Sequence, residues 1–113
     1  LLAAEAYNEL GNASAALPLL NQIRKRARGT NNFILTDVTT TDQSQLRERI
    51  RKERRVELAM EQHRWFDLLR WGIAGQTLKA AGKTFIDNKH ELFPIPQTEL
   101  DLSDGVLQQN SGW

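Results

Sequence analysis

The fold is decided by one stretch of the chain, residues 44–71, which reads SQLRERIRKERRVELAMEQHRWFDLLRW. It holds no glycine or proline and is rich in Arg, Glu, Leu and Gln, which are good helix formers. Gly72 and Gly75 then interrupt it. The composition predicts one long charged helix, and the Thr41-Asp42 pair in front of it is suited to cap its N-terminus.

One face of this helix carries apolar residues at both ends and carboxylates in the middle. Because the apolar anchors mark the buried side, Glu53 and Glu57 are expected in the core stripe, with Glu61 at its edge. At 100° per residue, the face comprises Leu46, Ile50, Glu53, Glu57, Met60, Arg64, Leu68 and Trp71.

Carboxylates at this spacing repel each other, and a buried carboxylate without a partner is costly. We therefore predict a partly buried Arg–Glu network that ties the long helix to the segments before it. The candidate cations are Arg54 and Arg64 on the same helix and Arg24, Arg26 and Arg28 earlier in the chain.

Two other interpretations of the carboxylates are weaker. Di-iron bundles need a Glu-x-x-His spacing, whereas His63 follows Glu61 by two residues. No nucleophile, oxyanion loop or second histidine lies near in sequence, which disfavours general acid–base catalysis. We expect no enzyme activity, no catalytic residue, no metal and no cofactor.

Aromatic and cationic side chains of the same stretch could bind a ligand. Trp65, Phe66, Trp71 and Trp113 could stack on a sugar or a base, but Trp71 lies on the core face. We interpret Trp65 and Trp71 as structural aromatics. Residues 47–55 hold six cations and two anions that point in all directions, which favours a solvated helix with salt bridges. A basic nucleic-acid-binding helical domain is kept as an alternative.

The flanking segments complete an all-α chain. Two helices, one ending at Gly11 and the next over 13–28, predict a tetratricopeptide-like hairpin. A Thr-rich loop follows over 30–43, in which Phe33, Ile34 and Leu35 are expected to tack the loop onto the core. A short helix over 73–81, extended pieces at 85–86 and 92–93, a helical turn from Pro96 and a loop-rich tail are expected after it. We predict a single helical domain, 1–113.

Composition sets further bounds on this chain of 113 residues, of which 40% are apolar. No apolar run approaches the ~20 residues of a membrane span. The net charge of +1 implies no strong whole-chain attraction to nucleic acid or anionic lipid. The chain has no Cys and begins at Leu1, as if in mid-helix, so we expect a C-terminal fragment of a larger protein. Its first helix would then expose an apolar face and favour self-association.

The segment from Arg51 to Gly72, RKERRVELAMEQHRWFDLLRWG, resembles the C-terminal signature of the SusD/RagB family, ERR-x-EL-x-x-E-G-x-RW-x-DL-x-RWG. The segments LFPIPQTELDL (92–102) and QNSGW (109–113) resemble the family's closing L-x-PIP-x-x-E-L and QNPGY. The first 28 residues are similar to its AEA…LN-x-x-R helices. Gln62 stands where the family usually has Gly, and Trp113 where it has Tyr.

The resemblance implies a surface lipoprotein of the bacterial outer membrane, anchored by a lipid upstream of this segment. Such proteins bind glycans or other nutrients and work with a TonB-dependent transporter of the SusC type. It implies a helical scaffold without catalysis, with the ligand bound mainly by regions outside this fragment and no nucleic-acid partner. No ligand-binding residue carries over from the motif. A free-standing helical protein–protein interaction module is the other alternative.

Overall fold

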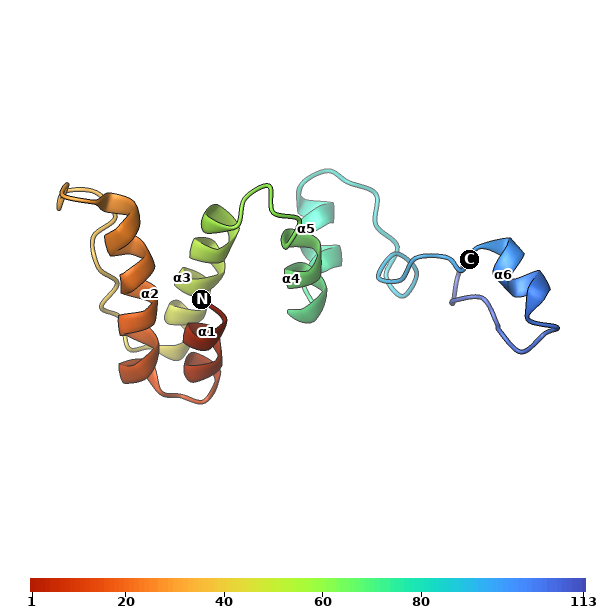
Figure 1. Cartoon of the computed structure of the whole chain (residues 1–113), viewed down its shortest axis with the longest axis horizontal. Coiled ribbons are helices and arrows are strands. Elements are labelled where there is room, and N and C mark those ends of the chain that lie inside the picture. Colours follow the sequence, from red (N-terminus) through yellow and green to blue (C-terminus); the bar gives the residue numbers. More distant parts are fainter. The chain divides into compact units, whose positions relative to one another are not determined.

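The computed structural model describes residues 1–113, and every regular element in it is a helix (Figure 1). The all-α class is confirmed, as are the helical hairpin, the charged helix after it and the loop-rich tail. The chain forms two compact units, Leu1–Gln62 and His63–Trp113. The helices are α1 (Leu2–Glu9), α2 (Ala13–Arg28), α3 (Gln43–Glu57), α4 (Arg64–Arg70), α5 (Ala74–Ala80) and α6 (Gln97–Leu102).

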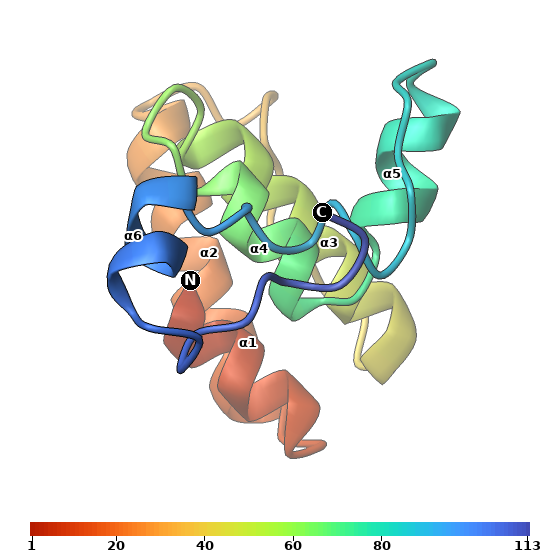
Figure 2. The same cartoon turned by 90° about the vertical axis from the view of Figure 1, so that its right-hand side faces the viewer.

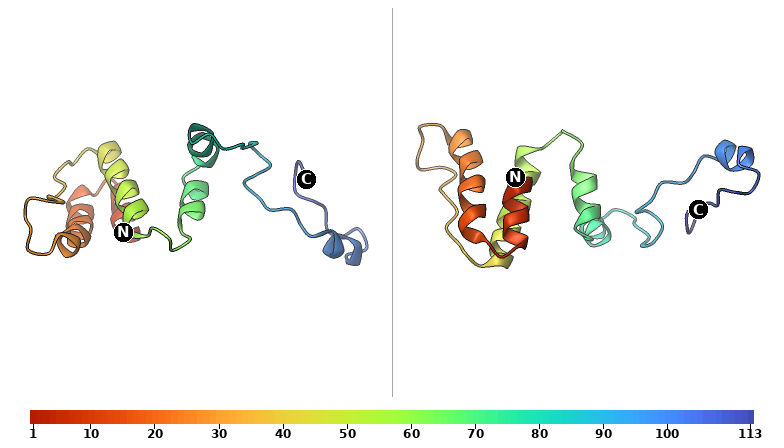
Figure 3. Two further views of the ribbon diagram at one scale, coloured as in Figure 1. Left: turned by 90° about the horizontal axis from the view of Figure 1, so that it is seen from above. Right: turned by 60° about the horizontal axis from the view of Figure 1, so that its bottom comes forward.

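In the first unit, α1 and α2 form an antiparallel hairpin and α3 packs against both (Figure 3). The turn uses Gly11 at φ 73°, a left-handed conformation that glycine adopts without a Cβ clash. Asn12 then caps α2, because its side-chain oxygen accepts the backbone N–H of Ala15 at 3.1 Å. The core of this unit consists of fully buried Ala4, Ala16, Leu20, Leu46 and Ile50.

Polar side chains fix where α3 begins. The carboxylate of Asp42 accepts the backbone N–H of Gln45 at 2.8 Å, which confirms the predicted cap. The side chain of buried Asn8 donates to the carbonyl of Gln43 at 3.0 Å, and the Gln43 side chain donates back to the carbonyl of Asn8 at 2.8 Å. The end of α1 is therefore tied to the first turn of α3.

The prediction of one continuous helix over 44–71 is wrong. The chain leaves the helix after Glu57 and resumes it at Arg64. Met60 and Gln62 both take positive φ angles, 68° and 61°. Met60 is 99% exposed instead of lying on the buried face. Neither glycine nor proline marks the break, and helix propensity is a weak preference that tertiary packing overrides.

The expectation that Phe33, Ile34 and Leu35 hold the loop to the core is also wrong. All three are exposed, Phe33 to 97%. The loop is held instead by side chains of α2. Asn21 accepts the backbone N–H of Val38 at 2.8 Å and donates to its carbonyl at 2.9 Å. These bonds satisfy backbone groups that an apolar contact would leave unpaired.

In the second unit, α4 packs on α5 around buried Leu68, Ala74 and Phe85. Gly72 joins the two helices at φ 66°, and Gly82 follows α5 at φ 72°. The predicted helix over 73–81 is confirmed to within a residue at each end. The extended pieces at 85–86 and 92–93 form no strand in the chain.

The tail after Pro94 is closed by amide side chains rather than by strand pairing. Gln109 accepts the backbone N–H of Ile95 at 2.8 Å and donates to its carbonyl at 2.9 Å. Asn110 donates to the carbonyl of Phe93 at 2.7 Å. The chain after α6 therefore returns beside the segment before it (Figure 2). The predicted turn from Pro96 is confirmed as α6.

None of the six helices combines the length and the apolar character that a bilayer-crossing segment needs.

The positive φ of Gln62 yields a first prediction. Because a side chain with a Cβ is strained in the left-handed region, Gln62→Gly should raise the free energy of unfolding by about 1 kcal/mol. Gln62→Ala keeps the Cβ and should give no such gain. Urea denaturation measures both. An equal gain for the two variants would contradict the backbone explanation and point to the side chain.

Candidate functional site

The predicted core carboxylate Glu53 lies beside Arg24 of α2. The Nη1 atom of Arg24 is 2.6 Å from Oε2 of Glu53, and the two side chains are only 17% and 11% exposed. The Nε–H of the same guanidinium donates to the carbonyl of Thr36 at 3.0 Å. A single arginine therefore joins α2, the loop and α3.

The next carboxylate along α3 lies in a wetter position. Glu57 is half-buried and pairs with Arg26, whose side chain is largely exposed. Arg28 turns away from α3: it pairs with Asp37 of the loop and donates to the carbonyl of Leu35 at 3.0 Å. The three candidate arginines of α2 therefore have different partners.

Two further ion pairs join α3 to α1. Buried Arg54 lies 4.0 Å from the carboxylate of Glu5. Arg47 donates two parallel hydrogen bonds of 2.7 Å to the two oxygens of Glu9. These bonds and the positive charge of Arg47 lower the pKa of Glu9 below its ordinary value, against the opposing effect of burial.

The other predicted network residues are Glu61 and Arg64. Glu61 is exposed in the turn after α3. Arg64 lies in α4, with its guanidinium carbon 5.9 Å from the ring centre of Trp71. Arg70 lies closer to the same ring, at 4.9 Å. Half-buried Trp71 thus contacts cations of its own helix.

Sequence reasoning missed the part that Asn21 plays. It stands three residues before Arg24, so both side chains leave the same face of α2 and reach the loop. This three-residue spacing was the feature of the sequence that could have indicated that Asn21 and Arg24 contact the same segment. The loop partners were not visible, because hydrogen bonds to backbone atoms leave no trace in residue type.

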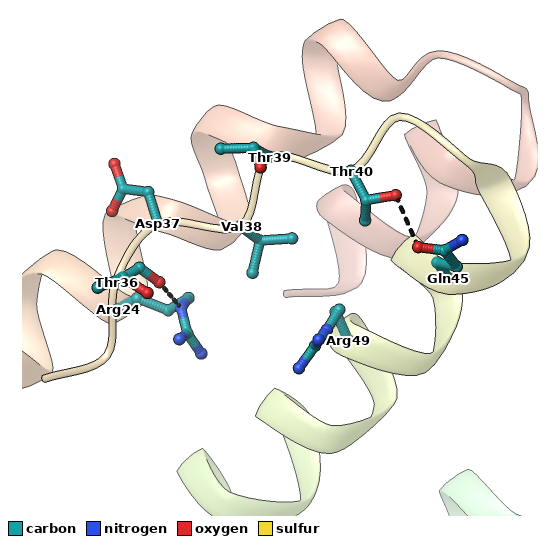
Figure 4. Close-up of a pocket in the computed structure, with 8 residues that line it drawn as sticks. All are labelled: Arg24, Thr36, Asp37, Val38, Thr39, Thr40, Gln45 and Arg49. Carbon is teal, nitrogen blue, oxygen red and sulfur yellow. Dashed lines mark hydrogen bonds between the residues drawn. The ribbon is translucent and has the colours of Figure 1, made fainter.

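Beneath this loop lies a polar hollow of ≈ 220 Å³ between α2, the loop and α3 (Figure 4). The guanidinium groups of Arg24 and Arg49 point toward one another across it, whereas the carboxylate of Asp37 points away. The rest of the lining is Thr36, Val38, Thr39, Thr40 and Gln45.

A second hollow of ≈ 280 Å³ shares Arg24 and Arg49 with the first. It adds the exposed cation Lys52 and an apolar wall. The apolar residues are Ala27, Leu35 and Val56, and the paired carboxylates Glu53 and Glu57 complete the lining.

The second unit holds an open aromatic hollow of ≈ 380 Å³. Half-buried Trp65 lies 6.4 Å from Phe85, ring centre to ring centre, and His90 lies 5.5 Å from Phe85 and 5.9 Å from Trp113. The indole N–H of Trp113 donates to the carbonyls of Lys89 and Leu92, both at 3.1 Å. Trp113, which the sequence left unconstrained, is therefore held in place.

The three hollows differ in the side chains that line them. Cations face the hollows of the first unit, and aromatic rings line that of the second. No group of three or more His, Cys, Asp or Glu side chains that could hold a metal ion occurs in the chain.

Comparison with known proteins gives one consistent family. The sequence model described as the SusD family matches residues 1–113. The chain is 35% identical to SusD-like protein P25 of Formosa agariphila over 98% of its length, and 32% identical to SusD-like protein P2 of the same organism over its whole length. It covers only 22% and 24% of those two relatives. No solved structure matches the chain significantly.

Burial ranks the carboxylates of α3, which yields a second prediction. Glu53→Gln should lower the free energy of unfolding by about 3 kcal/mol, because it leaves the partly buried guanidinium of Arg24 without its counter-charge. Glu57→Gln should cost about 1 kcal/mol or less, since its partner is solvated. Exposed Glu48, which lies 3.3 Å from Arg51, is the control, and Glu48→Gln should change stability by less than about 0.5 kcal/mol. Equal losses in urea denaturation would contradict this ranking.

The lowered pKa of Glu9 yields a third prediction, on pH. A carboxyl group whose pKa is lower in the folded than in the unfolded protein stabilises the fold at pH values above its unfolded pKa, near 4.5. This stabilisation is lost as the pH falls through the pKa of the folded protein. Glu9→Gln should therefore lose less stability than the wild type between pH 6 and pH 3. Glu61→Gln, at an exposed position, should follow the wild type. Urea titrations at both pH values measure this, and identical slopes for all three proteins would refute it.

Proposed function

Because this chain belongs to the SusD family, we propose that it is the helical scaffold part of a cell-surface glycan- or nutrient-binding lipoprotein. In this proposal the whole protein works with a TonB-dependent outer-membrane transporter of the SusC type. The lipid anchor and most of the ligand contacts belong to regions other than these residues.

The observation that carries the proposal is the extent of the family match. It covers residues 1–113, while the chain spans between a fifth and a quarter of the two SusD-like proteins named above. The whole protein's ligand and partner are therefore inferred from the family.

The scaffold part of the proposal is supported by how the motif residues are used. Glu53 and Glu57 are each paired with an arginine of α2. Both carboxylates form ion pairs that join α3 to α2. Residues engaged in this way position neighbouring elements, and they are poorly placed for chemistry on a bound substrate.

The pairing of the cations in α3 does not favour the nucleic-acid alternative. Arg47 is held by Glu9, and Arg54 lies beside Glu5. These ion pairs reduce the number of α3 cations that are available to phosphates.

The single-domain organisation and the outer-membrane location remain part of the proposal.

The proposal is tested on the full-length protein in its own bacterium, which gives a fourth prediction. An affinity-tagged copy extracted from outer membranes in mild detergent should bring down a TonB-dependent transporter, identified by mass spectrometry. The purified protein should also bind a soluble oligosaccharide on a glycan array.

The matched control is a copy whose lipid-attachment cysteine is changed to serine, which should leave the membrane and lose the transporter. Recovery of a different protein partner, without a transporter or any glycan, would refute the proposal in favour of a free-standing interaction module.

A further inference from the structure

The two hollows of the first unit adjoin through Arg24 and Arg49, and together they form a surface that we call the arginine groove. We infer that the arginine groove binds an acidic oligosaccharide, with the carboxylate or sulfate of one sugar seated between Arg24 and Arg49. The inference rests on the proposed glycan-binding function and names the class of glycan.

The two guanidinium groups of the groove are arranged to receive an anion between them. Their heads point toward one another across the polar hollow (Figure 4). Two cations that face each other repel, and an anion between them converts this repulsion into two attractions. Planar guanidinium groups are suited to this role, because Arg49 can offer two parallel N–H donors to a carboxylate or sulfate and Arg24 can add its remaining Nη2.

Both arginines keep N–H donors that no residue of the chain uses. Arg49 is exposed and makes no hydrogen bond or ion pair in the structure. Arg24 donates to Thr36 through Nε and to Glu53 through Nη1, which leaves Nη2 for a ligand. The pair with Glu53 also holds Arg24 in place, so little conformational freedom is lost on binding.

The carboxylates that line or border the groove already have arginine partners. Asp37 pairs with Arg28, and its carboxylate points away from Arg49. Glu53 and Glu57 are each paired with an arginine of α2. The exposed Lys52 in the second hollow has no partner, and it offers a second cation for the next charged sugar.

The rest of the groove lining combines polar and apolar side chains, as a sugar ring requires. The Thr40 hydroxyl already donates to Gln45 at 3.2 Å, which leaves the hydroxyl of Thr39 and the amide NH₂ of Gln45 to bond sugar hydroxyls. The apolar wall of Leu35 and Val56 can cover the C–H face of a ring. Each hollow lies just below the ~300–1,000 Å³ of typical ligand pockets, which suits one or two sugar units.

The test is calorimetry on the full-length protein with trigalacturonate, a sulfated trisaccharide and neutral maltotriose. Arg49→Gln should weaken binding of the acidic trisaccharides at least tenfold and leave the melting temperature unchanged, because Arg49 holds no other residue. The matched control is Arg55→Gln, which removes an exposed arginine of α3 outside both hollows and should weaken binding less than twofold. Arg49-dependent binding of either acidic trisaccharide supports the inference and identifies the anionic group.

Three outcomes would overturn it. The first is an equal effect of the two substitutions, which would indicate only long-range attraction. The second is that maltotriose binds as tightly as the acidic trisaccharides, or that neither acidic one binds. The third is that triglutamate binds as tightly and with the same dependence on Arg49, which would identify an acidic peptide as the ligand.

These results separate the two proposals. If the protein recovers its transporter and binds neutral glycans, but Arg49 has no influence, only the present inference fails. If acidic trisaccharides bind through Arg49 and no transporter is recovered, the proposed function fails, but the inference that the arginine groove binds acidic sugars is supported.

Discussion

The first unit depends on the pair between Arg24 and Glu53. A carboxylate that is 11% exposed on the core face of α3 must meet a cation, because burial without one costs several kcal/mol. Arg24 supplies that charge from α2 and, through its Nε–H, also holds the carbonyl of Thr36. One guanidinium thus links the two helices to each other and to the loop between them.

The path of the loop in turn creates the arginine groove. Side chains of α2, among them Asn21 and Arg28, bind backbone atoms of residues 35–38 and hold the loop above α3. Because these bonds hold the loop, its apolar residues Phe33, Ile34 and Leu35 are exposed and do not anchor it. Because Glu53 keeps Arg24 in position, the unpaired Arg49 faces a cation that cannot turn away, and the structural pair leads directly to the candidate binding site.

In the second unit, side chains near the C-terminus form hydrogen bonds with backbone groups of an earlier segment. Its closing segment carries amide side chains, Gln109 and Asn110, that bond the backbone of residues 93 and 95 as a neighbouring strand would. The indole of Trp113 does the same for Lys89 and Leu92. These bonds explain in physical terms why Gln, Asn and an aromatic residue occur together at the end of this chain.

Local features of the sequence determined the helices, because the forces involved act within a few residues. The hairpin, the cap at Asp42, the turns at Gly11 and Gly72 and the short α5 follow from propensity, capping and the tolerance of glycine for positive φ. The periodicity of α3 also placed Glu53 on its buried face. The break at residues 58–63 escaped prediction, because its positive φ angles fall on Met60 and Gln62, where residue type gives no sign of them.

Only the tertiary structure decided which cation meets which carboxylate. The spacing of α3 offered five candidate arginines, and periodicity states which face is buried but not what lies opposite. The packing of α2 on α3 selected Arg24 for Glu53 and Arg26 for Glu57, and it left Arg49 facing the groove. Partner choice depends on the distance between helices that are far apart in sequence, and that distance is set by the packing of the apolar core between them.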